Sequence, residues 1–238
     1  MNIYDFDGTL YSGDSTVDFL KYSFKKHPGL VRFLPAMGWA AAEHYLLKRV
    51  SKTDMKQRFY RIFTGFDAEG LLEEFWDKHQ HKIFSWYPGQ QEETDIIISA
   101  SPEFLLKPIC KRLGIRHLIA SRVDPKTGIY TGENCWGPEK PIRLKEEMGI
   151  THCDKFFSDS YSDQPLADIA DDAFLILKEC NVCASVGVVL NTDYRCGRSI
   201  LTLEVDDSVL DLVSAAVMTN GDLAVAVTSG MLLLNYDQ

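Results

Sequence analysis

The sequence predicts an α/β fold: a doubly wound, mainly parallel, Rossmann-like sheet with an inserted helical cap. Two observations support this prediction. Short apolar runs that end in polar residues, such as residues 96–98 and the pair Phe156 and Phe157, indicate buried strands of a parallel sheet. Between the first two predicted strands lie about eighty residues with the hydrophobic period of helices. A helical insertion at that point is expected to cover the carboxyl ends of the strands, where open α/β sheets bind ligands.

The chain is expected to divide into three parts. Residues 1–14 and 90–178 form the predicted core, and residues 15–89 form the predicted cap. Residues 179–238 stay unassigned, although their pattern indicates one helix and the run 223–236 indicates two strands. A length of 238 residues with 45% hydrophobic residues suffices for a core plus one inserted unit.

The predicted cap is a series of helices separated by three breaks. The breaks fall at residues 28–29, near Ser51 and around Gly65. The segment is rich in aromatic residues, most of which are expected to pack in the core: Phe33, Trp39, Tyr45, Trp76, Trp86 and Tyr87.

Asp5 and Asp7 stand directly after the first predicted strand. Two residues of the same parity on an extended segment project to the same side, and Gly8 permits a sharp turn after them. The pair therefore offers two carboxylates at a strand mouth, which is a place to hold a cation and a phosphate. Acidic residues before a glycine are also common in ordinary turns, so this interpretation depends on three further segments.

The second segment surrounds Ser99, at the end of the apolar run 96–98. Ser101 is expected to cap a helix whose first position is Pro102. Backbone amides at a helix start favour an anion, and the Ser99 hydroxyl can donate to a phosphate oxygen. Ser99 could equally do no more than end its strand, and the residue alone leaves both interpretations open.

The third segment places Lys140 near the start of a predicted helix that ends at Gly149. A cation is unfavourable there for the helix dipole, so an anionic partner would explain Lys140. Lys145, further along the same helix, is expected to be a solvated surface charge.

The fourth segment brings Asp159 to the end of a short strand and Asp163 to the start of the next helix. With Asp5 and Asp7 these residues would make four acids in one crevice. Such a crevice needs a cation, because like charges at close range suppress ionisation. Mg²⁺ fits this role, since it prefers carboxylate and phosphate oxygens and keeps several waters.

The four segments, in this order, resemble the motifs of the haloacid dehalogenase-like phosphohydrolase superfamily, particularly its phosphoserine phosphatase-like branch with a helical cap. The resemblance is carried by DFDGT, by IISAS, by Lys140 and by SDSYSD, and it spans residues 1 to about 178. It implies a Mg²⁺-dependent phosphomonoester phosphatase that acts through an aspartyl-phosphate intermediate. The implied roles are nucleophile for Asp5, general acid and base for Asp7, phosphate binding for Ser99, Ala100 and Lys140, and Mg²⁺ binding for Asp5, Asp7, Asp159 and Asp163.

The implied substrate is a small soluble metabolite similar to phosphoserine. Phosphoserine phosphatases of this branch carry a cap glutamate that meets the substrate amine, and this chain departs from them with Asp14 at that point. Arg58 and Arg61 are candidates to meet a substrate carboxylate.

A lipid phosphate is the alternative substrate. The apolar stretch 33–47 is too short to span a bilayer and is interrupted by Pro35 and Glu43, but it could rest on a membrane surface. We favour the soluble substrate, because the chain is acidic overall and no polybasic cluster accompanies the stretch.

Charge and composition limit the other partners. A net charge of −9 and a pI near 5.1 argue against nucleic acid, because no basic block could neutralise phosphates. The first residues do not resemble a signal peptide, so we expect a cytoplasmic protein without an integral membrane segment. Its six cysteines are then reduced thiols, and the pair Cys180 and Cys183 is expected to be incidental. The oligomeric state stays open.

A non-catalytic phosphate-binding module, such as a receiver domain, is the alternative from another class. Receivers also combine acids, a hydroxyl and a lysine around Mg²⁺. In receivers, however, the acid pair comes first and the phosphoacceptor, hydroxyl and lysine follow, whereas here acids both open and close the series. The order of the motifs therefore favours an enzyme.

Overall fold

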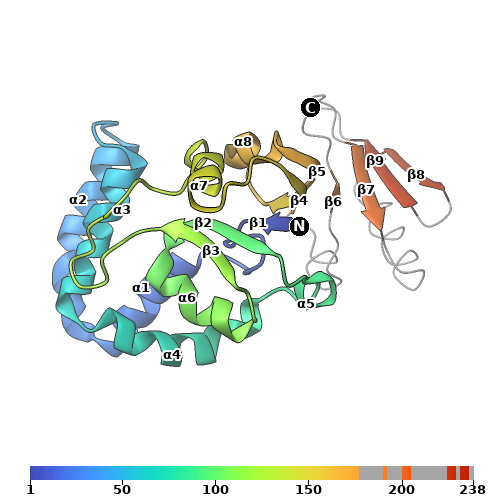
Figure 1. Ribbon diagram of the computed structural model, residues 1–238. Helices are drawn as coiled ribbons and strands as arrows, with labels where there is room; N and C mark the ends of the chain where they lie inside the picture. The colour runs from blue at the N-terminus through green and yellow to red at the C-terminus, as the bar shows by residue number, and fades with distance from the viewer. Residues whose placement is uncertain (177–189, 192–199, 205–223, 229–230, 236–238) are drawn as a thin grey trace.

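The computed structural model describes residues 1–176 together with residues 190–191, 200–204, 224–228 and 231–235 (Figure 1). The helix predicted near residue 209 and the pair Cys180 and Cys183 lie outside the described residues. Among the described residues, no helix is both long and apolar enough to cross a membrane.

Five parallel strands form the sheet of the core, and they confirm the predicted fold class. They are β1 (Asn2–Tyr4), β2 (Ile96–Pro102), β3 (His117–Ser121), β4 (Cys153–Ser158) and β5 (Ala170–Leu175). Their order in the sheet is β3-β2-β1-β4-β5. From β1 the strand order runs to β2 and β3 on one side, and then to β4 and β5 on the other side. Ligands of such sheets bind at the carboxyl ends of the strands where the order reverses, here between β1 and β4.

The sheet continues beyond β5 with antiparallel strands (Figure 1). These are β6 (Leu190–Asn191), β7 (Ile200–Glu204), β9 (Met231–Asn235) and β8 (Ala224–Thr228), in that order from β5. The two strands predicted within residues 223–236 are thus β8 and β9, which pair with each other.

Helices fill the chain between β1 and β2, as the hydrophobic period predicts. They are α1 (Ser15–Lys26), η1 (Pro28–Phe33), α2 (Leu34–Tyr45), α3 (Lys52–Tyr60), η2 (Arg61–Gly65), α4 (Ala68–His79), η3 (Gln80–Lys82) and α5 (Tyr87–Gln90). The three predicted breaks fall between the α-helices: residues 28–29 begin η1, Ser51 precedes α3 and Gly65 ends η2. Ser51 caps α3 through a capping box with Asp54, and Asp14 caps α1 by accepting from the Val17 amide at 2.8 Å.

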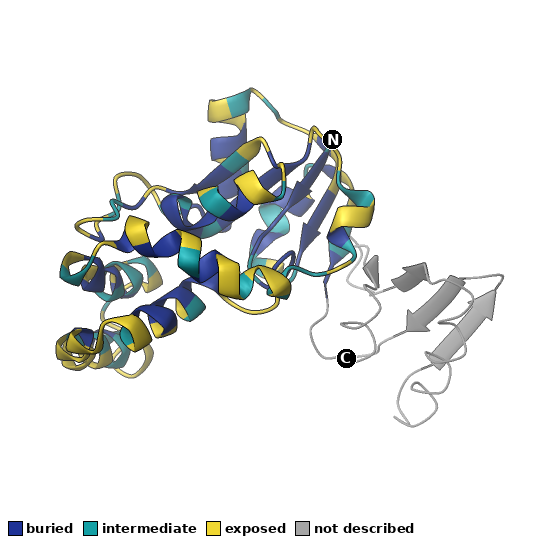
Figure 2. Ribbon diagram, turned by 90° about the horizontal axis from the view of Figure 1, so that it is seen from below, coloured by how far each residue is buried: buried dark blue, intermediate teal, exposed yellow. Residues whose placement is uncertain are grey.

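The core helices are α6 (Glu103–Arg112), α7 (Glu139–Met148), η4 (Tyr161–Asp163) and α8 (Gln164–Ala167). They cover both faces of the sheet. Alternate residues of a strand point to opposite faces, so each strand contributes side chains to both layers. On β2, Ile97 joins the cluster beneath α6, while Ile96 and Ile98 join the cluster beneath α7 and α8. All three are fully buried, as predicted, and Figure 2 shows the strands as the buried centre of the molecule.

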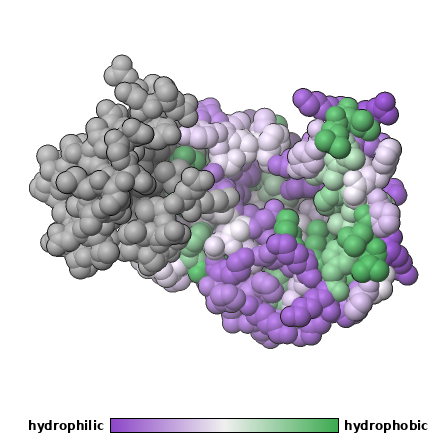
Figure 3. Space-filling view, turned by 180° about the vertical axis from the view of Figure 1, so that it is seen from behind, coloured by the Kyte–Doolittle hydropathy of each residue, from purple (hydrophilic) through white to green (hydrophobic). Residues whose placement is uncertain are grey.

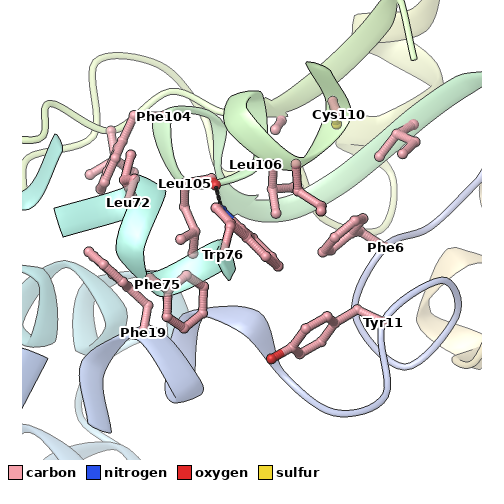
Figure 4. Close-up of a cluster of buried hydrophobic side chains, with 14 of the residues drawn as sticks. Phe6, Tyr11, Phe19, Leu72, Phe75, Trp76, Phe104, Leu105, Leu106 and Cys110 are labelled. Atoms are coloured by element: carbon pink, nitrogen blue, oxygen red, sulfur yellow. Dashed lines mark hydrogen bonds between the residues drawn. The ribbon is translucent and has the colours of Figure 1, made fainter. Parts of the chain in front are cut away.

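The helical insertion and the sheet share one hydrophobic cluster (Figure 4). Trp76 on α4 donates its indole N–H to the Leu105 carbonyl of α6 at 2.8 Å. The rings of Phe6 and Tyr11, just after β1, stand edge-on against Trp76. The insertion is therefore fixed to the core at α4. The division into a core of residues 1–14 and 90–178 and a cap of residues 15–89 stays a proposal.

One local prediction is wrong. Strand β2 continues to Pro102, so the helix begins at Glu103 and Ser101 does not cap it. The Ser101 hydroxyl instead contacts Asp7 and Thr16.

Most of the six aromatic residues named for the segment pack in the core, as predicted. Trp76 and Tyr87 are fully buried, and Phe33 and Trp86 pack against the same cluster. Trp39 and Tyr45 are the exceptions, at 60% and 63% exposed.

The loop between β3 and α7 packs against α3 so closely that it requires glycine. Gly128 has φ +70°, and a Cβ there would lie 2.1 Å from the Tyr60 carbonyl oxygen. Gly114 has nearly the same φ, +73°, but open space around it.

We therefore predict that Gly128→Ala lowers the free energy of unfolding by about 3 kcal/mol, because the left-handed backbone and the collision with Tyr60 both cost stability. The matched control Gly114→Ala carries only the backbone cost, about 1 kcal/mol. Urea denaturation measures both values. Equal losses in the two variants would contradict the close contact between the loop and α3.

Candidate active site

Asp5 stands at the carboxyl edge of the sheet, directly after β1. Its amide donates to the Phe157 carbonyl of β4 at 2.8 Å, which continues the strand pairing by one residue. Asp159 follows the end of β4 at the same edge. Asp5 is thereby held between β1 and β4, where the strand order reverses. Ligands of such sheets are expected to bind at this position.

Lys140 connects Asp5 to Asp163. Its Nζ lies 2.8 Å from Asp5 Oδ1 and 2.6 Å from Asp163 Oδ2, and only 2% of the lysine side chain is exposed. Ser158, the last residue of β4, donates its hydroxyl to Asp163 Oδ2 at 2.8 Å. The cation predicted to need an anionic partner thus contacts two carboxylates within the chain itself.

The acids of this site outnumber its cation. Burial raises the pKa of Asp5 to about 7; Lys140 opposes this rise, while the charges of Asp163 and Asp159 add to it. Burial alone would lower the pKa of Lys140, but Asp5 and Asp163 raise it above its ordinary value. Lys140 is therefore a fixed positive charge, and it does not fully offset the effect of burial and of the neighbouring acids on Asp5.

Asp7 is held by the start of α1 and by Ser101. Its Oδ1 accepts from the Ser15 amide at 2.6 Å, and its Oδ2 accepts from the Ser101 hydroxyl. The hydroxyls of Ser101 and Thr16 are in turn 2.8 Å apart. Burial raises the pKa of Asp7 to about 6; the charge of Asp14 adds to the rise and the Ser101 hydrogen bond opposes it. Asp7 therefore has a fixed orientation, and its pKa lies closer to neutral pH than that of an ordinary aspartate.

Ser101 and Thr16 are functional candidates that the sequence did not identify. Ser101 lies two residues after Ser99 at the end of β2, where the pairing with β3 shifts register. The local preference of serine for helix caps suggested another role for it.

The predicted phosphate-binding residues lie at the end of β2. Ser99 is buried, and its Oγ accepts from the Ser101 amide at 3.1 Å. A hydroxyl that accepts such a bond keeps a proton to donate. The Ala100 carbonyl accepts from the Ser121 hydroxyl at 3.0 Å, which fixes the peptide at the strand end.

The other substrate candidates have separate contacts. Asp14 is exposed at the start of α1, and its charge acts on Asp7. Arg58 on α3 pairs with Glu43 of α2, and Arg61 is exposed at the start of η2. The structure therefore does not bring the two arginines together with the acids at the strand ends.

Lys56 on α3 is the cation that the insertion directs toward these acids. Burial lowers its pKa, and Lys52 adds to this, while the charges of Asp14, Asp7 and Asp5 oppose it. Within the part of the chain that the structure describes, Lys56 forms no ion pair. Its position one turn after Lys52 was the only sequence signal, and it is indistinguishable from that of a solvated helix lysine.

The donor set suits a hard cation that retains water. Asp163 Oδ1 is buried without a hydrogen-bond partner among the described residues. Those residues contain no group of three His, Cys, Asp or Glu side chains arranged to hold a metal by themselves. Mg²⁺ does not require such a group, because it commonly binds one or two carboxylates and completes its shell with water and phosphate oxygens. The carboxylates at this edge fit that requirement.

The family model of haloacid dehalogenase-like hydrolases matches residues 3–168. The chain belongs to this family. The match covers every acid described above, the lysine between them and the helical insertion. The resemblance stated from the sequence is confirmed, and the protein is a hydrolase of this family.

Curated relatives include phosphatases of Mycobacterium tuberculosis. A probable phosphatase is 32% identical over 89 residues, which cover 34% of this chain and 31% of that protein. Phosphoserine phosphatase SerB1 is 25% identical over 198 residues, which cover 73% of this chain and 63% of that protein. The matched part of this chain thus spans about a third of the length of the first relative and less than two thirds of the length of the second.

Solved structures share the fold. A protein of unknown function from Bordetella pertussis Tohama I has a TM-score of 0.55 at 20% identity, over 71% of this chain and 85% of its own. A probable phosphoserine phosphatase from Vibrio cholerae has a TM-score of 0.52 at 12% identity, over 72% and 55%. At these identities the similarity concerns the fold alone.

We predict that Lys140→Met lowers the free energy of unfolding by about 3 kcal/mol, because it leaves Asp5 and Asp163 buried without their cation. The loss should be smaller at about pH 5 than at about pH 8: as the pH falls through the raised pKa of Asp5, protonation removes the uncompensated charge.

The matched control is Lys145→Met, which removes an exposed lysine from the same helix and should change stability by less than about 0.5 kcal/mol. Urea denaturation in metal-free buffer at both pH values compares them. If both variants were as stable as wild type, the buried ion pairs would not be present.

Proposed function

We propose that the protein is a Mg²⁺-dependent phosphomonoester phosphatase that acts through an aspartyl phosphate on Asp5. The observation that carries the proposal is the buried Lys140 ammonium between Asp5 and Asp163, with Asp7 held two residues from Asp5 by Ser15 and Ser101. Such a site can fix a nucleophile, a proton donor and positive charge around one phosphoryl group, which is what phosphoryl transfer requires. Membership in a hydrolase family argues against the receiver-like alternative.

In the first proposed step a carboxylate oxygen of Asp5 attacks phosphorus and the bond from phosphorus to the leaving alcohol breaks. Asp7 gives its proton to that alcohol. The raised pKa of Asp7 supports this role, because a general acid must hold a proton near the working pH. One difficult displacement is thereby split into two.

In the second step water attacks phosphorus, Asp7 takes the proton of that water, and the bond from phosphorus to Asp5 breaks. Inorganic phosphate leaves, and both acids return to their starting forms. Each proton transfer is typically worth about 10² to 10⁴ in rate.

The phosphoryl oxygens are proposed to bind the Ser99 hydroxyl, the Ala100 amide and the Lys140 ammonium. Asp5, Asp7, Asp159 and Asp163 are the residues proposed to hold Mg²⁺. When bound, Mg²⁺ supplies positive charge that neutralises these acids and the phosphate oxygens. The unpartnered Asp163 Oδ1 supports this assignment, because a buried carboxylate oxygen needs a partner such as a metal-bound water.

The proposed substrate carries a second polar group beyond its phosphate. Asp14 suits an amine and Lys56 suits an anionic group, and this combination supports a phosphoserine-like metabolite. SerB1 is named a phosphoserine phosphatase, which agrees with this class. Arg58 and Arg61 stay proposals for contact with a carboxylate, but their present contacts give them less support than Lys56. A lipid phosphate stays the alternative.

We predict that Asp5→Asn abolishes hydrolysis of p-nitrophenyl phosphate, since the amide is nearly isosteric but cannot act as the nucleophile. Asp7→Asn should still release a first equivalent of p-nitrophenol, a leaving group that needs no protonation, and then stall. Stopped-flow absorbance separates this burst from steady turnover, and circular dichroism confirms that both variants are folded. Steady turnover at the wild-type rate in either variant would contradict the assigned roles.

We predict that EDTA abolishes activity and that Mg²⁺ restores it. Ca²⁺ should be a poor substitute, because its larger and looser coordination shell misplaces Asp5 relative to phosphorus. Phosphate release from p-nitrophenyl phosphate after each addition measures the effect. Full activity in protein freed of metal would remove Asp159 and Asp163 from their proposed role.

A further inference from the structure

Helix α2 packs against α3 but leaves six of its twelve residues exposed. Of its twelve residues, only Ala40 is buried. Eleven large hydrophobic side chains are exposed among the described residues, and six of them lie in α2 or beside it: Val31, Leu34, Trp39, Tyr45, Leu46 and Leu47. Figure 3 shows hydrophobic side chains gathered at this end of the molecule. We call these six residues the α2 surface.

The composition of α2 requires a partner for this surface. A helix with apolar residues on all sides is normally buried, and a contiguous exposed apolar patch marks an interaction site. Trp39 and Tyr45 are the most informative members, because their rings suit a boundary between an apolar phase and water. They are 60% and 63% exposed.

The charge around the α2 surface is opposite to that of the whole chain. Between residues 28 and 52 there are four cations, Arg32, Lys48, Arg49 and Lys52, and one acid, Glu43. Glu43 is itself paired with Arg58. The chain as a whole carries −9. An apolar surface with a positive surround complements an anionic lipid surface, where each basic residue contributes about 1 kcal/mol.

The same charges disfavour a second copy of the chain as the partner. In a twofold contact the same patch faces itself, so the cations beside one α2 surface would lie near those of the other. The sequence argument for a soluble substrate was that no polybasic cluster accompanies the apolar stretch. The local excess of cations weakens that argument.

We propose that the α2 surface docks on an anionic membrane surface. Trp39, Leu34 and their neighbours enter the boundary between headgroups and acyl chains, while Lys48 and Arg49 meet anionic headgroups. Helix α3 packs against α2 and carries Lys56 (Figure 1). Helix α3 therefore links the docked surface to the candidate active site through Lys56. The proposal concerns binding and does not depend on the proposed catalytic activity.

Co-sedimentation of the full chain with vesicles tests the proposal. The vesicles contain about 30 mol% phosphatidylglycerol in phosphatidylcholine, and pure phosphatidylcholine vesicles provide the comparison. Wild type is expected to sediment with the anionic vesicles, and less at high salt. Trp39→Glu should weaken the apparent affinity for the vesicles about tenfold or more, since an aromatic side chain that enters the membrane on docking is replaced by a charge. Lys48→Gln with Arg49→Gln should weaken binding to the anionic vesicles by about tenfold.

The matched control is Ile142→Glu, which places the same charge on an exposed apolar residue of α7. It should bind vesicles as wild type does. The surface variants and this control should hydrolyse p-nitrophenyl phosphate like wild type, which shows that they are folded. Asp5→Asn, proposed to be inactive, should bind vesicles like wild type, so failure of docking is distinct from failure of the catalytic proposal.

Three results would overturn the proposal. Wild type could stay in the supernatant with anionic vesicles. Trp39→Glu could bind as tightly as wild type. Sedimentation velocity without vesicles could reveal a wild-type dimer that Trp39→Glu dissociates, which would make the α2 surface a contact between copies of the chain.

Discussion

The structure depends on one buried cation. The Lys140 ammonium lies between Asp5, which follows β1, and Asp163, which ends η4 directly before α8. Burying three charged groups is costly unless they neutralise one another, so this contact fixes how α7 approaches the edge of the sheet. The hydroxyl of Ser158 adds a further donor to Asp163. The site therefore concentrates charged groups from three separate parts of the chain in one buried place.

The same contact supports the proposal that the site acts on phosphate. Lys140 faces both Asp5 and Asp163, and the pKa of Asp5 still rises as a result of burial and of the neighbouring acids. Binding of a further cation next to these acids is therefore favoured. An anionic ligand can bind there together with such a cation. The insertion contributes to the chemistry as well, because the Ser15 amide at the start of α1 orients Asp7. The first helix of the insertion, α1, thus fixes the position of Asp7, the proposed proton donor.

The sequence predicted the elements whose patterns are local. The apolar run 96–98 became a buried strand because a central parallel strand is covered on both faces, and Lys140 was recognised because its position on a helix conflicts with the dipole. Contacts between distant segments could not be predicted in this way. Ser101 binds Asp7 across 94 residues of sequence, and this tertiary contact prevailed over the local preference of serine for a helix cap. Lys56 looked like any surface lysine, since only the fold brings α3 near Asp14 and Asp7. Most of the aromatic residues of the insertion were expected in the core, but the sequence did not show that Trp39 and Tyr45 would be the exposed ones.

The most direct test of the central claim is chemical trapping of the covalent intermediate. Wild-type protein is mixed with Mg²⁺ and excess p-nitrophenyl phosphate, quenched during turnover and reduced with borohydride, which converts an aspartyl phosphate to homoserine. Peptide mass spectrometry then locates the converted residue. The account predicts homoserine at position 5 and unmodified Asp7, with no conversion when substrate is omitted. Conversion at another aspartate, or turnover without any conversion, would contradict the assignment of Asp5 as the nucleophile.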